Sequence, residues 1–139
     1  MNAKQFGNTI AVRLEKGEEI CASLKEVCTK YAVTAASITG LGAVKGATVC
    51  LFDPNERQYH DTELTAFLEL TNLTGNASVM DGACYLHLHI TLADGNGHAF
   101  GGHLKRAVIG ATAELFITVL PGTIDRVHNE ETGLNLWSW

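Results

Sequence analysis

The segment that most constrains the fold of this chain is a run of alternating side chains that ends at a glycine-rich turn. Side chains alternate in character from Cys84 to Ala93, as they do in a strand that buries one face. The four residues that follow, Asp94-Gly95-Asn96-Gly97, are a strong signal for a β-hairpin. We therefore expect the chain to be built around an antiparallel sheet.

The remaining periodic segments predict more strands and one helix. Apolar residues recur at helical spacing from Ile20 to Tyr31, and the acidic Glu18 and Glu19 suit the first turn of that helix. Strands are expected at residues 8–14, 35–41, 48–52, 58–73 and 107–120, where the fourth range holds one or two strands. The expected fold class is α+β: a mostly antiparallel β-sheet with one main helix packed on it, in a single domain of residues 1–139.

The charge balance argues against nucleic acid as the partner. The chain carries 10 Lys and Arg against 15 Asp and Glu, a formal net charge of −5 with neutral histidines. DNA binding depends on a clustered basic face that neutralises phosphates, and Lys105-Arg106 is the only adjacent basic pair. Only a basic patch created by oligomerisation would change this expectation.

The cysteines and the apolar runs indicate the cellular setting. Cys21, Cys28, Cys50 and Cys84 stand among apolar residues without a C-x-x-C pair, so reduced thiols in the core are expected. No run reaches the roughly 18 apolar residues of a membrane span, and residues 1–20 lack the apolar centre of a signal peptide. The expected location is cytoplasmic, with no membrane partner.

Three histidines of the hairpin are expected to share one face. His87 and His89 are two residues apart on a strand, so both side chains project from the same side. A three-residue loop of residues 95–97 would set His103 directly opposite His89 on the returning strand. The register of the hairpin therefore predicts a cluster of three imidazoles.

The other histidines are not expected to join this cluster. His98 lies an odd number of residues from His103, so regular strand geometry points it to the opposite face. A bulge at Gly101-Gly102 would break that parity, because paired glycines often mark bulges. His60 and His128 stand alone in turn-like segments, where solvent exposure is the expectation.

A cluster of His87, His89 and His103 predicts a divalent transition-metal site. Each imidazole can place a nitrogen about 2.0–2.1 Å from a zinc ion, and a three-histidine set leaves a coordination position open for water or a ligand. Zinc is the expected ion, although nickel, iron and copper also accept imidazole. The alternative is that the three histidines are ordinary polar residues of a sheet face or a subunit interface.

Glu114 is a second candidate because it stands in the apolar run of residues 111–116, where a buried carboxylate needs a partner. It is a candidate catalytic base, or it orients a liganding imidazole from behind, with Arg13 in the same supporting layer. The competing interpretation is a salt bridge between Glu114 and Arg13, or simple exposure at a sheet edge.

The C-terminal stretch is short and aromatic. Its large apolar residues are Leu134, Leu136, Trp137 and Trp139. Side chains of this size are expected to be buried, either in the core of the same chain or against a neighbouring subunit.

Six short motifs are similar to those of one known family. They are Arg13-Leu14 with Gly17-Glu18, Thr39-Gly40-Leu41-Gly42, Leu73-Thr74-Gly75-Asn76, Leu86-His87-Leu88-His89, Gly101-Gly102-His103-Leu104 and Thr112-Ala113-Glu114. Over nearly its whole length the chain resembles the plants-and-prokaryotes conserved (PPC) domain family, in its prokaryotic single-domain form. The resemblance implies an α+β fold, a homotrimer, and a metal-capable site at the positions of His87, His89 and His103.

The same resemblance bears on DNA binding and on catalysis. Prokaryotic members carry the label of predicted DNA-binding proteins, and plant members bind DNA through separate AT-hook segments with an Arg-Gly-Arg-Pro core, which this chain lacks. The resemblance implies no settled enzymatic activity. A weaker similarity to cupins, through Gly82, His87, His89 and Asp94, lacks the glutamate that the cupin pattern requires after its histidines.

Two classes of function follow from these observations. The first is a trimeric metal-binding protein, either a metal-dependent enzyme, with a hydrolytic water activated by zinc, or a small-ligand sensor. The second is a DNA-associated regulatory or protein-interaction module without catalytic activity.

Overall fold

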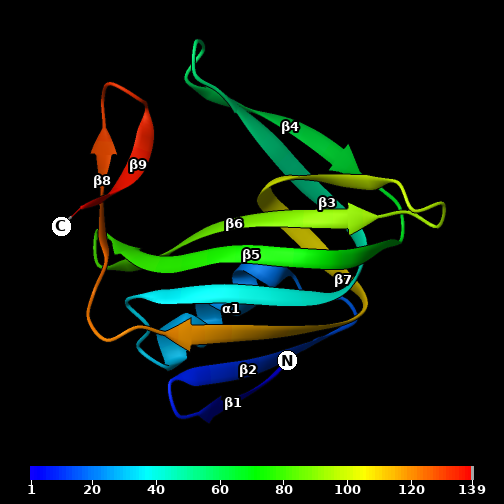
Figure 1. The fold of residues 1–139 in the computed structure, drawn as a ribbon, viewed down its shortest axis with the longest axis horizontal. Helices are drawn as coiled ribbons and strands as arrows, with labels where there is room; N and C mark the ends of the chain where they lie inside the picture. The colour runs from blue at the N-terminus through cyan, green and yellow to red at the C-terminus, as the bar shows by residue number, and fades with distance from the viewer. Residues whose placement is uncertain (139) are drawn as a thin grey trace.

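The computed structural model describes residues 1–138, and within that range the protein is mostly β-sheet with one helix. Helix α1 spans Ile20–Lys30. The strands are β1 (Asn2–Phe6), β2 (Thr9–Glu15), β3 (Ala36–Asp53), β4 (Gln58–Leu64), β5 (Leu68–Met80), β6 (Ala83–Ala93), β7 (Ala99–Val119), β8 (Asp125–Asn129) and β9 (Leu134–Ser138) (Figure 1). Among the described residues, no helix is long and apolar enough to cross a membrane.

The four long strands pair in a closed ring. β7 pairs with β3, β3 with β5, β5 with β6, and β6 with β7 again, and all four pairings are antiparallel. β2 and β1 extend the sheet from β7, and β4 pairs with β3. A closed ring leaves fewer unpaired strand edges and holds each strand from both sides. The site described below lies on two strands of this ring, β6 and β7.

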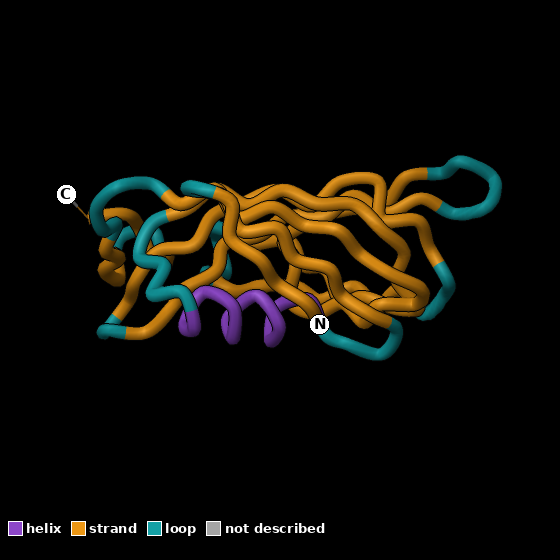
Figure 2. Tube along the Cα trace, turned by 90° about the horizontal axis from the view of Figure 1, so that it is seen from below, coloured by secondary structure: helices purple, strands orange, loops and turns teal. Residues whose placement is uncertain are grey.

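Helix α1 covers one face of the strands (Figure 2). Its apolar stripe, which includes Ile20, Leu24 and Val27, is buried in the core. The Glu19 carboxylate caps the first turn by accepting hydrogen bonds from the backbone N–H groups of Cys21 (3.0 Å) and Ala22 (2.7 Å). The same carboxylate accepts a bond of 3.0 Å from the backbone N–H of Ala107 in β7. Glu19 therefore caps the helix and also fastens it to the sheet.

The strand boundaries differ from the sequence prediction in instructive places. The expected separate strands at residues 35–41 and 48–52 are one strand, β3, which bends through irregular pairing between Gly40 and Gly46. A Cβ at Gly42 would lie 2.4 Å from the carbonyl oxygen of Thr112, so glycine here permits close pairing with β7 rather than ending the strand. The prediction of a break in this segment was wrong for that reason.

Other boundaries were also misplaced. The strand expected to end at Thr74 to Asn76 continues to Met80, because Gly75 lies in the regular ladder between β5 and β6. The returning strand of the hairpin, which contains His103, and the strand expected at residues 107–120 form one continuous strand, β7. β1 and β8 were not anticipated, since both are short and carry mostly polar residues.

All four cysteines are free thiols, as expected. Cys28 and Cys50 are buried, and Cys21 and Cys84 are partly buried. They contribute to the core as small apolar side chains.

Replacing Glu19 by alanine removes the cap of α1 and its bond to β7. We expect the free energy of unfolding to fall by about 1–3 kcal/mol, because three backbone N–H groups lose their acceptor. Chemical denaturation measures the change. Glu26→Ala, at an exposed site on the same helix, is the matched control and should cost less than about 0.5 kcal/mol. Equal losses in the two variants would contradict this role of Glu19.

Gly75→Ala tests the close approach of β5 to β6. A Cβ at Gly75 would lie 2.0 Å from the carbonyl oxygen of His87, so the two strands would have to separate. We expect a loss of at least about 2 kcal/mol in the free energy of unfolding. The control is Gly95→Ala in the hairpin loop, where an added Cβ meets nothing within 4 Å. A Gly75→Ala variant as stable as the control would show that the strands can yield at this point.

Candidate metal centre

The β6–β7 hairpin has the register that the sequence predicts. The backbone N–H of Asp94 donates to the carbonyl of His98 at 3.0 Å, and Gly97 has a φ of 81°, which glycine adopts without strain. His89 on β6 pairs directly with His103 on β7. The pairing runs through Gly101 and Gly102 without a shift, so the bulge considered at these glycines does not occur between these strands.

The three predicted imidazoles come together on one face. The ring centroids of His87 and His89 lie 5.4 Å apart, those of His87 and His103 5.2 Å, and those of His89 and His103 5.4 Å. One nitrogen from each ring can be chosen so that all three lie within 4.8 Å of one another. His87 and His103 are partly buried, and His89 is exposed. The cluster therefore has a buried side and an open side.

The surroundings favour the neutral form of the partly buried imidazoles. Burial, with the nearby His87 and His89, lowers the pKa of His103 from its ordinary value to about 4. Burial lowers the pKa of His87 as well, and the positive charge of Arg126 adds to the effect. Neutral imidazole is the form that binds a metal ion, because its nitrogen lone pair is available.

The cluster lies in a pocket of about 640 Å³. Two hairpins contribute to its walls, β3–β4 and β8–β9, and both project to the upper side of the molecule in Figure 1. Tyr59 of β4 packs against His103 with a ring-centroid distance of 5.0 Å. Arg57 connects the two hairpins, because its Nη1 donates to the carbonyl of Glu130 at 3.1 Å. The histidines therefore lie in a bounded pocket rather than on an open sheet.

The C-terminal strand β9 contributes to the wall of the pocket. Leu134, Leu136 and Trp137 line the pocket beside the histidines, and Leu136 and Trp137 stay exposed. Of the two expectations, burial in the core of the same chain does not hold for Leu136 and Trp137, and burial against a neighbouring subunit stays a prediction. Trp139 lies outside the described residues.

Arg126 is a pocket residue that sequence reasoning missed. It stands on β8, a short strand without clear alternation, so nothing in the local sequence distinguishes it from a surface arginine. In the structure its side chain is buried and lines the same pocket as the histidines. The only sequence feature that pointed to this region was the apolar and aromatic C-terminal stretch that follows Arg126, because side chains of that size need a packing partner.

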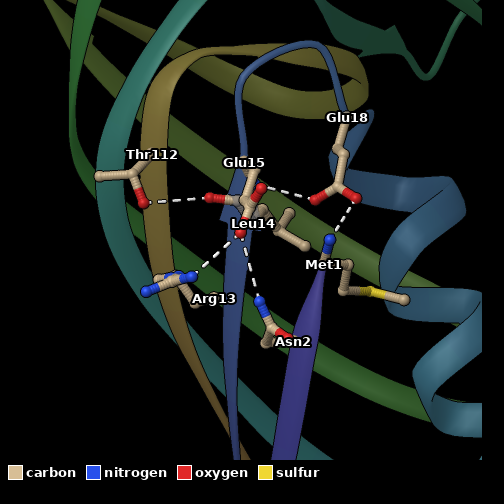
Figure 3. Close-up of polar contacts among 7 residues, drawn as sticks. All are labelled: Met1, Asn2, Arg13, Leu14, Glu15, Glu18 and Thr112. Atoms are coloured by element: carbon tan, nitrogen blue, oxygen red, sulfur yellow. Dashed lines mark hydrogen bonds and ion pairs between the residues drawn. The ribbon is translucent and has the colours of Figure 1, made fainter.

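Glu114 and Arg13 do not lie beside the three histidines. They face one another as register partners on β7 and β2, and they line a separate hollow that contains none of the three histidines. Figure 3 shows Arg13 beside Glu15, where its Nη2 donates to Oε1 at 3.0 Å. Both Arg13 and Glu114 are exposed. The structure offers no contact through which either residue could orient a liganding imidazole, and exposure is the interpretation of Glu114 that it favours.

The remaining histidines lie outside the cluster, as expected. His98 is exposed and pairs with Asp94, with 3.1 Å between Nδ1 and Oδ2. His128 is exposed on β8. His60 is also exposed and lies near Asp53 and Glu56, a second group of potential ligand atoms on the β3–β4 hairpin. That group is open to solvent, and its members already bond to one another and to the backbone of the turn.

The donor set fits a divalent transition metal. Three imidazoles from two adjacent, hydrogen-bonded strands offer nitrogen ligands without a carboxylate, which suits zinc and its neighbours better than magnesium or calcium. The exposed side of His89 leaves room for a further ligand. The arrangement is that of an open site rather than a closed structural one.

Solved structures with a similar fold are known. A "putative dna binding protein" from Bacteroides thetaiotaomicron is 33% identical, with a TM-score of 0.95 over 99% of this chain and 96% of that one. A metal-containing protein from Archaeoglobus fulgidus is 32% identical, with a TM-score of 0.89 over 97% of this chain and 96% of that one.

Sequence comparisons assign the family. The bifunctional protein GlmU of a Synechococcus strain is 31% identical over 112 residues, which are 79% of this chain and 16% of that protein. The chain thus matches about a sixth of the length of this relative. The model of the Plants and Prokaryotes Conserved (PCC) domain matches residues 1–121, a range that contains the hairpin and all three clustered histidines. The chain therefore belongs to the plants-and-prokaryotes conserved domain family.

Proposed function

We propose that this protein binds one divalent transition-metal ion, with zinc first among the candidates, through His87, His89 and His103. The single observation that carries the proposal is the convergence of three imidazoles, with nitrogens within 4.8 Å of one another, inside a pocket. Histidines that serve only as surface polar groups have no reason to converge in this way on two strands.

The residues around the cluster support a metal-binding role. The lowered pKa values of His87 and His103 keep both rings neutral near pH 7, so protons do not compete for their nitrogens. Main-chain pairing on both sides of β6 holds the ligands in place before any ion arrives. Little ordering free energy would then be lost on binding.

The pocket favours a protein that handles a small molecule at the metal. When bound, a divalent transition metal supplies a Lewis acid that polarises a ligand oxygen. The chain's own residues bound the space in which such a ligand sits: Tyr59 covers His103, and the β8–β9 hairpin covers the opposite wall. A metal-dependent enzyme and a small-ligand sensor are both consistent with this geometry.

A DNA-associated regulatory or interaction role is the second candidate, because two structural neighbours are described as putative DNA-binding proteins. The charge of this chain opposes it. The formal net charge is −5, and phosphate neutralisation requires a basic face. A protein-interaction role without catalysis does not conflict with the charge.

We also propose that the chain forms a homotrimer in the cytoplasm. Large apolar side chains are exposed on β3 and β7, with Leu41 at 57% and Phe116 at 52%. Leu41 pairs with Glu114, two residues from Phe116, so the two side chains lie close on the paired strands. Exposed apolar groups that lie together favour a subunit interface.

Light scattering coupled to gel filtration tests the assembly. We expect a mass of three times the 14.9 kDa of one chain, and Phe116→Lys should shift the protein toward smaller species because a charge enters the interface. The control is Thr29→Lys on an exposed face of α1. A monomeric wild-type protein would exclude the trimer.

Elemental analysis of protein purified without a histidine tag tests the metal site. We expect about one transition-metal ion per chain in the wild type, and its loss in His103→Ala, which removes one of three ligands. His98→Ala is the matched control, because His98 is exposed and outside the cluster; it should keep the full metal content.

A thermal measurement complements the stoichiometry. A metal ion that binds only the folded chain, at a free concentration of about 100 times its Kd, should raise the free energy of unfolding by about 2.7 kcal/mol. A chelator should therefore lower the Tm of the wild type and leave His103→Ala unchanged. Wild-type protein without stoichiometric metal, even after incubation with zinc, would refute the proposed function.

A further inference from the structure

We propose that the pocket binds a small organic anion, with Arg126 holding its carboxylate or phosphoryl group and the surrounding rings holding its apolar body. This inference rests on the proposed function for the chemistry that would act on the ligand, since the histidines share the pocket. The anion-binding part is carried by Arg126 itself, so it can be tested with and without metal.

Arg126 is a buried cation whose described partners are all neutral. Arg126 is only 8% exposed. Nε donates to the Ser78 hydroxyl at 2.7 Å, Nη1 to the carbonyl of Asn135 at 2.6 Å, and Nη2 to Oδ1 of Asn76 at 2.9 Å. Among residues 1–138, no carboxylate forms an ion pair with it. Burial of a charge without a counter-ion is costly, so its retention calls for an anionic partner.

The guanidinium still has donors to offer. It carries five N–H groups, and the three hydrogen bonds use one on each nitrogen. One N–H therefore remains on Nη1 and one on Nη2. Two donors are the number that a carboxylate or phosphoryl group engages in a bidentate contact.

The fold places this cation beside the metal ligands. Asn76, which accepts from Arg126, is the register partner of His87 across β5 and β6. Arg126 and all three histidines line the same pocket. A ligand bound through its anionic group at Arg126 would therefore have its adjacent atoms near the histidine cluster.

The rest of the pocket selects for an apolar, flat body. The guanidinium carbon lies 4.7 Å from the ring centroid of Tyr85 and 5.8 Å from that of Trp137. Further apolar lining comes from Leu51, Phe52, Tyr59, Leu134 and Leu136. A volume of about 640 Å³ falls in the range of small-molecule sites. This lining is larger and more apolar than an inorganic anion requires.

A structural role is the competing explanation, because Arg126 also fastens the β8–β9 hairpin to β5. The two explanations differ in a measurable way. A purely structural arginine would give the wild-type protein no affinity for organic anions. An anion-binding arginine gives such affinity, and it depends on the guanidinium more than on the anchoring hydrogen bonds.

Isothermal titration calorimetry with three probes separates these cases: phenylacetate, phenylphosphonate, and the neutral phenylacetamide. Each is titrated into chelator-treated and zinc-loaded wild-type protein. We expect at least one anion to bind in both states, more tightly with zinc, and phenylacetamide to bind at least about tenfold more weakly. The stronger of the two anions identifies a carboxylate or a phosphoryl ligand.

Variants assign the binding to Arg126. Arg126→Gln should lower the affinity for the anion at least about tenfold, since the loss of a charge-assisted contact corresponds to about 1.4 kcal/mol or more. Arg106→Gln is the matched control, because Arg106 is exposed and does not line the pocket; it should leave the affinity for the anion unchanged. If circular dichroism shows that Arg126→Gln does not fold, Arg126→Lys is measured instead. Lysine keeps the charge but cannot form a bidentate contact, so the affinity for the anion should fall to a smaller extent.

The outcomes distinguish this inference from the metal proposal. Zinc binding without affinity for either anion would overturn the anion site and leave the metal site standing. Anion binding that depends on Arg126 in a protein that takes up no zinc would support the anion site and refute the metal site. Equal anion affinity in the wild type and Arg126→Gln would overturn the inference.

Discussion

Backbone hydrogen bonds between β6 and its two neighbours place every ligand of the candidate metal centre. β7 sets His103 opposite His89, and β5 sets Asn76 opposite His87. Because β3 joins β5 to β7, β6 is held on both sides within the closed ring. The distances among the imidazoles thus follow from main-chain pairing, which a ligand does not need to create. This is the preorganisation that a binding site requires.

The pocket contains residues that suit a metal ion and a residue that suits an anion. It contains the imidazoles of His87 and His103, whose pKa values are lowered by burial, with the positive charge of Arg126 adding to the effect at His87. Its wall holds Arg126, a cation surrounded by neutral acceptors and aromatic rings. A metal ion and an anion would each stabilise the other in this setting, because a ligand's negative charge offsets both positive centres. The acidic character of the whole chain does not extend into this pocket.

Family membership and local chemistry contribute different information. The family model covers the hairpin with the histidines, whereas its match ends at residue 121, before Arg126 and the β8–β9 hairpin. The histidine cluster therefore lies within the part that defines the family. The wall that contains Arg126 lies in the segment beyond that match.

The hairpin register could be predicted because it is local. A two-residue period and a short glycine loop determine which side chains of β6 and β7 share a face, and both are visible within about twenty residues. Glu114 illustrates the limit of a local pattern. In the apolar run of residues 111–116 alternate side chains point to opposite faces, and Glu114 lies on the exposed face, which is one of the interpretations that the sequence left open. Gly40 and Gly42 of β3 were interpreted as interruptions between strands, although they allow close pairing with β7.

What the sequence determined by itself was a mostly antiparallel protein with one amphipathic helix and three histidines on one face of a hairpin. Periodicity and turn chemistry act between residues that are near in the chain, so they can be read without coordinates. Only the tertiary structure decided that a pocket surrounds the histidines and that Arg126 faces it. Both depend on two hairpins meeting across the sheet and on contacts such as Arg126 to Ser78, 48 residues apart, and no local pattern encodes a contact of that range.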